Sequence, residues 1–398
     1  MILPLGDSPN PRGLPLVTYG LLAANIAVYV LISLPLGQTP VDPSDPAVRE
    51  YLEVVARALP HGVGLRDLLQ QTTAYDLFVF RYGFRPVAPE VGALFSSLFL
   101  HAGFLHLFGN MLFLWIYGDN VEHQLGSLTY LCAYLGTGVA ATLFHTVFDL
   151  DSPLPLVGAS GAISGVLGFY FRWFPRNQVR LLVLLFPFFL DVFLVPARLV
   201  LGMYLVVDNL LPFLLARGME GGGVAHGAHI GGFIAGLAAA WLVDRRQVEA
   251  RPAEYVRAGV KAPSDRAVLH AAIDAGRYRD AAAQYFALAG HDTRRVLDPN
   301  DSLALADWLR QSGHPEAALV VYRRHLRDYP TGPGVAEAHL GAGLVQLEAL
   351  GEATAAYQHF LDALDADPSP LVAAEARTAL QAIAARQKFQ VGRPRRRT

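Results

Sequence analysis

Long apolar stretches recur along the first part of this chain, at lengths that suit helices crossing a membrane. A bilayer core about 30 Å thick requires about 20 apolar residues per helix. Six windows meet this length: residues 14–36, 91–117, 127–148, 156–174, 196–215 and 223–243. The apolar run 181–195 is shorter and contains Pro187 and Asp191, so we expect an interfacial or re-entrant segment there, leading into the fifth helix. The pattern predicts an all-α fold: a membrane bundle of six transmembrane helices, followed by a soluble helical domain.

Charged residues are rare in the middle of the chain and common after it. Of 66 Asp, Glu, Lys and Arg side chains, 14 lie in residues 1–90, 12 in residues 91–243 and 40 in residues 244–398. A stretch nearly free of charge suits lipid, whereas the last stretch has the composition of a soluble protein. This distribution excludes a single soluble globular enzyme and a disordered chain.

The two compositions predict two domains and a linker. We expect a membrane core, a linker, a helical repeat domain and a basic tail over residues 1–246, 247–263, 264–388 and 389–398, respectively. The net charge of −2 provides no basic surface, so we expect no nucleic-acid partner. The single cysteine, Cys132, permits no intrachain disulfide and no cysteine-based metal site.

Loop charges predict the orientation, because arginine-rich loops stay on the cytoplasmic side. Six arginines follow the fourth and sixth helices: Arg172, Arg176, Arg180, Arg245, Arg246 and Arg251. The long loop 37–90 has seven acids against five arginines and is expected outside. The loop with Asp119 and Glu122 does not fit this scheme, but acids count little in it. We expect a multi-pass protein of the bacterial inner or plasma membrane with both termini in the cytoplasm.

The C-terminal region repeats at intervals of 37 and 38 residues. Each unit has a glycine, then an alanine five residues later, then an aromatic residue four further on: Gly276, Gly313 and Gly351; Ala281, Ala318 and Ala356; Tyr285, Tyr322 and Phe360. A glycine at the turn and a small residue where paired helices touch resemble degenerate tetratricopeptide repeats. Such an array implies a surface for a cytoplasmic protein partner. A generic bundle of helical hairpins is the alternative.

Ionisable and polar groups inside apolar helices are costly, and each is a candidate for function. The second window contains His101, His106 and Asn110. His106 and Asn110 are four residues apart, so they lie on one helical face and can donate hydrogen bonds to a common point. Taken alone, they also suit interhelical hydrogen bonding.

The fourth window opens with the sequence Gly-Ala-Ser-Gly, residues 158–161. Pro153 and Pro155 precede it, so the helix begins no earlier than about residue 157. Ser160 then lies in the first turn, where backbone N–H groups have no partner within the helix. Small residues continue along one side of this helix: Gly161, Ser164, Gly165 and Gly168. They let another helix approach closely.

The sixth window contains a histidine at the head of a glycine stripe. His229, Gly232 and Gly236 share one helical face. Two glycine stripes are suited to pack together, and their contact would bring His229 within reach of the Ser160 hydroxyl. A serine and a histidine in this arrangement are a nucleophile and its general base. His226, one turn earlier, suits a polar interface, with a proton shuttle as the alternative.

Together these motifs resemble the rhomboid family of intramembrane serine proteases, over about residues 14–243. The H-x4-H-x3-N, G-x-S-G and A-H-x-x-G-x-x-x-G motifs of the family occur in order on the expected helices. The resemblance implies a Ser160–His229 dyad without an acid. It also implies an oxyanion hole formed by the Ser160 N–H, His106 and Asn110, and a structural role for Gly118, Glu122 and Gly126. No metal or cofactor is implied; the substrates are transmembrane proteins in the lipid bilayer.

Two positions depart from the family pattern. Many members have an aromatic residue four positions after the serine, where this chain has Ser164. We therefore expect either that another contact orients His229 or that its ring is held less firmly. Some members also have a Trp-Arg pair in the first loop, for which the nearest candidates are Phe84 and Arg85. Neither departure removes a member of the dyad.

Two other functions remain open at this stage. One is a catalytically inactive rhomboid-like scaffold that binds client membrane proteins; it is disfavoured because both the serine and the histidine are present. The other is a metal site built from the four histidines of the second and sixth windows: His101, His106, His226 and His229. The sequence has no H-E-x-x-H motif, which argues against a zinc protease.

Overall fold

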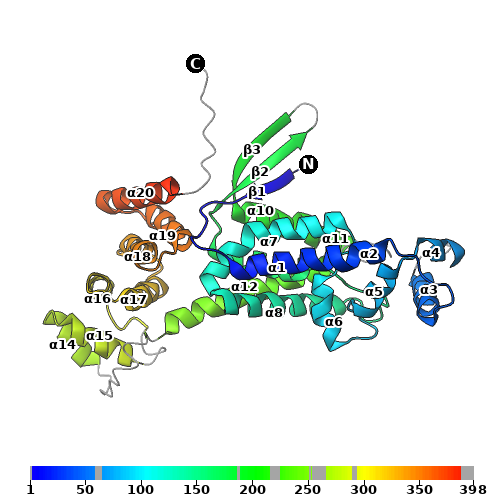
Figure 1. The fold of residues 1–398 in the computed structure, drawn as a ribbon. Coiled ribbons are helices and arrows are strands. Elements are labelled where there is room, and N and C mark those ends of the chain that lie inside the picture. Colours follow the sequence, from blue (N-terminus) through cyan, green and yellow to red (C-terminus); the bar gives the residue numbers. More distant parts are fainter. Residues whose placement is uncertain are drawn as a thin grey trace. The chain divides into compact units, whose positions relative to one another are not determined.

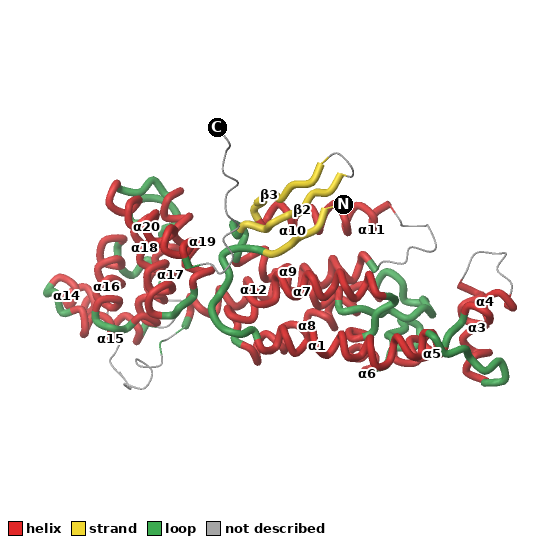
Figure 2. The backbone as a smooth tube through the Cα atoms, turned by 45° about the horizontal axis from the view of Figure 1, so that its top comes forward, coloured by secondary structure: helices red, strands yellow, loops and turns green. Residues whose placement is uncertain are grey.

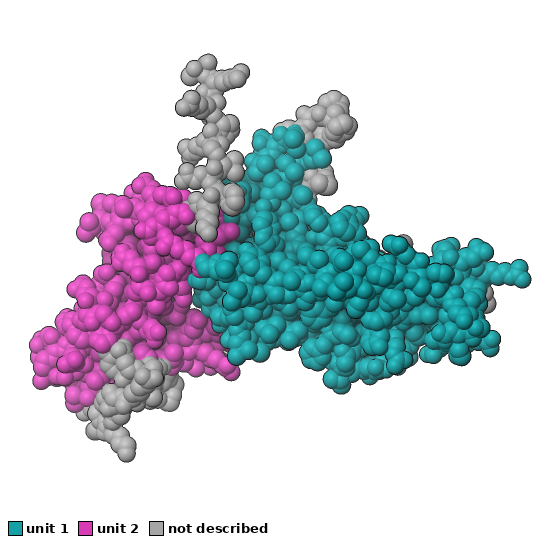
Figure 3. Space-filling model, viewed as in Figure 1, with its two compact units in different colours: residues 1–7, 13–240 teal, residues 8–12, 241–398 magenta. Residues whose placement is uncertain are grey.

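A computed structural model describes residues 2–58, 65–185, 189–215, 225–250, 252, 266–288 and 294–386. The chain forms two compact units (Figure 3). The first comprises Met1–Asp7 and Gly13–Ala240, and the second comprises Ser8–Arg12 and Trp241–Thr398. The expected linker starts later than residue 247, because helix α12 continues to Glu249. Most of that linker and the whole basic tail lie outside the described residues.

The first unit is a helical bundle with a small sheet at one end (Figure 1). Its long helices are α1 (Leu16–Val28, continued through a π-helical turn by α2, Leu34–Gly37), α7 (Phe104–Leu125), α8 (Ser127–Thr146), α9 (Ser160–Trp173), α10 (Ala197–Leu205, continued through a second π-helical turn by α11, Leu211–Leu215) and α12 (His226–Glu249). The shorter helices are α3 (Pro46–Ala58), α4 (Leu65–Gln71), α5 (Ala74–Tyr82) and α6 (Val91–Ser96).

Four of these elements are long and apolar enough to cross a membrane, namely Leu16–Gly37, Ser127–Thr146, Ala197–Leu215 and His226–Glu249. A fifth forms if Val91–Phe99 and Phe104–Leu125, which meet at 89°, count as one broken span. The second window is therefore not one continuous helix, because residues 100–103 interrupt it before α7. The fourth window yields only the 14-residue helix α9, since the chain up to residue 159 is not helical.

The structure is mostly helical, as predicted, but it also contains a small β-sheet. The described parts of the run 181–195, expected as an interfacial or re-entrant segment, are β-strand. Strand β2 (Gln178–Leu185) pairs antiparallel with β3 (Phe189–Pro196), and β1 (Ile2–Gly6) pairs antiparallel with the other edge of β2 (Figure 2). A run rich in Val, Leu and Phe suits a strand as well as a buried helix, and two strands of eight residues satisfy their backbone groups across the hairpin. The β1 partner lies far away in the sequence, so local pattern gave no sign of it.

Glycine positions let α9 and α12 pack backbone to backbone. A Cβ added at Gly232 would collide with the carbonyl oxygen of Gly161, and one added at Gly236 would collide with that of Gly165. A Cβ at Gly168 would collide with the backbone of Phe233. Contacts that advance along both helices together show that α9 and α12 run parallel, so both begin at the same end of the bundle. The predicted stripe contact is present.

Glu122 joins helix α7 to the start of α1. Its carboxylate accepts hydrogen bonds from the N–H groups of Val17 and Thr18 at 2.9 and 2.8 Å, and from the hydroxyls of Thr18 and Ser127 at 2.8 and 2.7 Å. These N–H groups belong to the first turn of α1, where a helix provides no internal acceptor. The carboxylate thus caps α1, and α1 starts at the end of the bundle where α7 stops.

The second unit is a row of helices that turn back on one another. Its helices are α14 (Arg266–Asp274), α15 (Tyr278–Ala287), α16 (Pro299–Gln311), α17 (Pro315–Asp328), α18 (Val335–Leu344, ending in a π-helical turn), α19 (Ala353–Asp365) and α20 (Pro370–Ala385). The turns α14–α15, α16–α17 and α18–α19 each contain one of the predicted glycines at positive φ: Gly276, Gly313 and Gly351. The predicted alanines and aromatic residues of the three units are all buried. Three helical hairpins are therefore present.

Candidate functional site

Helix α9 begins at Ser160, and the residues up to Gly158 disfavour an earlier start. Pro153 and Pro155 have no backbone N–H group to donate to a helix, and Gly158 has a φ of +127°, which residues other than glycine rarely adopt. A helix of 14 residues is about 21 Å long, shorter than the bilayer core of about 30 Å. Residues 161–170 are all buried in the bundle. Ser160 is thus at the top of a central helix that is too short to reach both membrane surfaces.

The segment before Ser160 is fixed by the preceding loop. Phe84 and Leu156 exchange backbone hydrogen bonds of 3.1 and 2.7 Å, and the Gly158 N–H donates to the carbonyl of Ser97 at 2.9 Å. The Phe84 side chain is buried, and the guanidinium of Arg85 lies 4.1 Å from the centre of the Phe80 ring. Phe84 therefore anchors the extended segment that leads to the serine, whereas the Arg85 side chain packs on Phe80.

His229 lies beside Ser160 in the helix packing. Gly161 follows the serine, and Ala228 precedes the histidine. A Cβ built on Gly161 would lie 3.8 Å from the carbonyl oxygen of Ala228. The two predicted dyad residues are thus at the N-terminal ends of adjacent parallel helices. Within the part of the chain that the structure describes, no hydrogen bond joins the Ser160 hydroxyl to the His229 ring.

Asn209 orients the His229 ring, and sequence reasoning missed it. The Asn209 Oδ1 atom lies 2.6 Å from His229 Nδ1, and Asn209 Nδ2 donates to the carbonyl of Tyr204 at 2.8 Å. Because the Nδ2 donor is engaged, Oδ1 is the atom that faces the imidazole, and it accepts the Nδ1 proton. The Nε2 atom then has the lone pair that a general base needs. Asn209 lies in the π-helical turn Val206–Leu210. A polar side chain inside an apolar window was the available signal for this residue.

Tyr204 provides the aromatic contact that position 164 lacks. The ring centres of Tyr204 and His229 are 6.3 Å apart, with 31° between the ring planes. The Tyr204 and Ser164 hydroxyls form a hydrogen bond of 2.6 Å. Of the two alternatives for His229, the structure therefore shows contact with other residues, Tyr204 and Asn209 of the fifth helical segment.

The His106 ring lies close to Ser160 across Gly158, and Asn110 follows His106 by one turn of α7. The position of a Cβ on Gly158 is 2.9 Å from His106 Nε2 and 3.6 Å from Ser160 Oγ, so only a glycine keeps this space open. Asn110 is buried, and its Nδ2 donor has no hydrogen-bond partner among the described residues. An unsatisfied buried donor costs about 1–3 kcal/mol unless something accepts its proton. His106 and Asn110 lie one turn apart on α7, as the spacing predicted.

Two further histidines of the membrane unit, His101 and His226, lie close to these groups. The His101 ring is edge-on to His106, at 5.1 Å between centres, and Tyr75 fixes the His101 backbone through hydrogen bonds of 2.8 and 3.1 Å. His226 Nδ1 lies 3.4 Å from Asn209 Oδ1, the atom that also contacts His229. Within the described residues these four histidines do not converge as a common ligand set.

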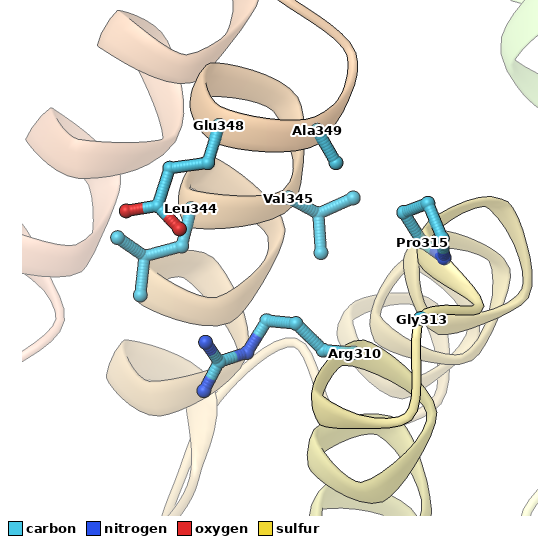
Figure 4. A pocket seen from close by; sticks show the side chains of 7 residues that line it. All are labelled: Arg310, Gly313, Pro315, Leu344, Val345, Glu348 and Ala349. Atoms are coloured by element: carbon cyan, nitrogen blue, oxygen red, sulfur yellow. The ribbon is translucent and has the colours of Figure 1, made fainter.

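A hollow in the second unit is separate from this chemistry. It has a volume of about 320 Å³ and lies between the α16–α17 turn and the end of α18 (Figure 4). Its lining contains Arg310 and Glu348 and none of the residues assigned to the dyad or the oxyanion hole. The candidate active site is therefore defined by packing contacts and hydrogen bonds at the head of α9, not by this hollow.

Sequence comparison with known proteins finds rhomboid relatives for part of this chain. Residues 88–246 match the family model described as Rhomboid domain. The chain is similar to Rhomboid protein 1, mitochondrial, of Saccharomyces cerevisiae, with 28% identity over 172 residues, or 42% of this chain and 46% of that protein. It is also similar to the Rhomboid protease GluP of Bacillus subtilis, with 44% identity over 75 residues, or 19% of this chain and 14% of that protein. Each of these two matches spans less than half of the relative's length.

Proposed function

We propose that this chain is an intramembrane serine endopeptidase. The match of residues 88–246 to a rhomboid domain, the rhomboid relatives and the apolar helices of a multi-pass membrane protein support this proposal. The substrates of the proposed enzyme are the transmembrane segments of other membrane proteins, and its dyad is Ser160 and His229. The observation that carries the proposal is the start of α9: a serine at the head of a buried, short helix, beside a parallel helix that has His229 in its first turn.

The contacts of His229 support its role as base. In the proposed reaction His229 Nε2 removes the Ser160 proton as Oγ attacks the carbonyl carbon of the scissile bond. The imidazolium then donates this proton to the leaving amine, and a water molecule hydrolyses the acyl enzyme by the reverse sequence. Asn209 holds the ring through Nδ1 throughout, the place that an aspartate takes in a triad, but without a negative charge.

The donors near Ser160 support an oxyanion hole. The tetrahedral intermediate places a negative oxygen close to the serine, in the space that Gly158 leaves between His106 and Ser160. The Ser160 N–H, His106 Nε2 and Asn110 Nδ2 are the three proposed donors. A buried donor without a protein partner, as at Asn110, is what a site arranged for the transition state requires.

The course of the helices supports an active site in the outer half of the membrane. The sheet lies at the end of the bundle where α9 stops, and Arg172, Arg176 and Arg180 belong to that end. By the positive-inside rule this end faces the cytoplasm. Ser160 and His229 are at the other end. In this proposal α9 crosses the bilayer together with the non-helical segment before it, and the bent pair crosses once. The chain then crosses six times, and both termini are cytoplasmic.

The test is a cleavage assay with the protein in detergent and in vesicles, against single-pass membrane proteins. We expect Ser160→Ala and His229→Ala each to abolish cleavage while the melting temperature is retained, since the two residues act as a unit. Substantial turnover by either variant would exclude the dyad.

The alternative is an inactive scaffold that binds client helices through the same fold. It predicts that the wild type and Ser160→Ala bind clients equally and that neither cleaves any member of a broad panel. Cleavage by the wild type and its loss in Ser160→Ala would exclude the scaffold.

The three helical hairpins of the second unit support a tetratricopeptide-like array that binds a cytoplasmic protein partner. The glycine turns and the buried small and aromatic positions have the pattern of such repeats. Removal of residues 252–398 should leave cleavage of a generic model helix unchanged in detergent. Cleavage of the native client in cells should fall, because a tethered second contact raises the client's effective concentration. A folded but inactive membrane unit would contradict this division.

A further inference from the structure

Two histidines and an aspartate meet between α18 and α19 in the second unit. His339 lies on α18, whereas His359 and Asp362 lie one helical turn apart on α19. The Nδ1 atoms of the two histidines are 2.9 Å apart, and His339 Nδ1 is 3.9 Å from Asp362 Oδ2. All three ligand atoms lie within 4.8 Å of one another. No catalytic or repeat position assigned above belongs to this cluster.

The chemistry of the three groups matches a borderline metal ion of the zinc class. Zn²⁺ binds imidazole nitrogen at about 2.0–2.1 Å and carboxylate oxygen at about 2.0–2.2 Å, in tetrahedral geometry. Two nitrogens bound in this way are about 3.3 Å apart, so the histidine pair would have to open by only about 0.4 Å. The His339 side chain is 18% exposed and that of Asp362 is 39% exposed, which leaves a path from solvent and room for a water as fourth ligand.

The protonation state of the pair favours metal binding. Two nitrogens 2.9 Å apart share one proton, because two protonated Nδ1 atoms would repel each other. Arg323 lies within electrostatic reach of His359. Arg323 opposes a dication, and the carboxylates of Asp362 and of Glu352, which interacts with Arg323, offset that charge.

We propose that His339, His359 and Asp362 form a zinc-class metal site that fastens α18 to α19. Binding would displace the proton between the two Nδ1 atoms and join the two helices of one hairpin, so it would stabilise the array independently of proteolysis. Sequence reasoning expected no metal because the ligands come from two helices that only the fold brings together; the pair His359 and Asp362 alone is a weak signal.

The test titrates Zn²⁺ into the full-length protein, purified in detergent with a tag that contains no histidine, in competition with a chromophoric chelator. The wild type should bind one more Zn²⁺ than His359→Gln, and Asp362→Asn should weaken that site by about tenfold or more. The control His270→Gln, on α14 of the same unit, should bind like the wild type.

A second measurement keeps the test valid if a histidine variant folds poorly. Calorimetric titration in two buffers of different ionisation enthalpy should show proton release on Zn²⁺ binding by the wild type. Asp362→Asn is isosteric at a partly exposed side chain, so circular dichroism should show it folded. Equal Zn²⁺ stoichiometry and affinity in the wild type, Asp362→Asn and His270→Gln would overturn the proposal.

Discussion

The contact between Asn209 and His229 allows the proposed role of the base to be tested apart from folding. Substitution Asn209→Ala removes the atom that lies 2.6 Å from His229 Nδ1. In the transition state His229 carries a positive charge, so the lost bond is charge-assisted, and such bonds contribute about 1.5–3 kcal/mol. That free energy corresponds to a fall in kcat of roughly 10- to 150-fold, with KM little changed, because the substrate does not touch Asn209 in the proposed reaction.

A second variant separates catalysis from stability. Asn209→Asp keeps an oxygen acceptor for Nδ1 but loses the donor to the Tyr204 carbonyl, a bond of 2.8 Å. We therefore expect Asn209→Asp to melt no higher than Asn209→Ala and yet to recover most of the lost kcat. The matched control is Asn25→Ala, which removes another buried amide with a 2.8 Å bond to a backbone carbonyl.

The assay is the initial rate of cleavage of a single-pass model substrate, measured over a range of substrate fractions in the micelle, with melting temperatures recorded for each variant. Asn25→Ala should lower the melting temperature and leave kcat unchanged. If kcat instead follows the melting temperature across Asn209→Ala, Asn209→Asp and Asn25→Ala, Asn209 has a structural role only and the reasoning is refuted.

Other substitutions test the oxyanion hole, the helix packing and the buried carboxyl of the N-terminal segment. Asn110→Ala should lower kcat by about 100- to 1,000-fold and leave measurable activity above Ser160→Ala; equal and total loss with a lower melting temperature would indicate packing instead. Gly236→Ala should prevent stable folding, seen as lost monodispersity in detergent, because its Cβ would collide with the Gly165 carbonyl. Burial raises the pKa of Asp7 to about 7, so the folded protein keeps this carboxyl protonated at a pH where the unfolded chain ionises it. The free energy of unfolding therefore falls as pH rises from about 4 to about 7. Asp7→Asn should remove up to about 4 kcal/mol of that fall. Identical pH profiles of the melting temperature for the wild type and Asp7→Asn would contradict this role of Asp7.

Local sequence pattern predicted the features that depend on residues close together in the chain. The start of α9 near Ser160 follows from two prolines and a glycine, and the α9–α12 contact follows from two glycine stripes. The hairpin turns of the second unit follow from Gly276, Gly313 and Gly351. In each case a single steric property, the absence of a Cβ or of an N–H, decides the structure.

Features that depend on distant partners were missed. The run 181–195 reads as an apolar segment of either type, and its strand state follows from pairing within the hairpin and with β1. Asn209 was not selected from the sequence, because only the fold brings its amide against His229. His339 and His359 lie 20 residues apart on two helices, and their rings meet only because α18 and α19 pack side by side.

The central claim, that Ser160 is a nucleophile activated by His229, is tested most directly by covalent labelling. The full-length protein in detergent is treated with a fluorophosphonate, and the modified residue is mapped by mass spectrometry. We predict that Ser160 Oγ displaces fluoride and becomes phosphonylated in the wild type, and that His229→Ala lowers this labelling to background while remaining folded. Labelling of another serine, or equal labelling of Ser160 with and without His229, would contradict the account.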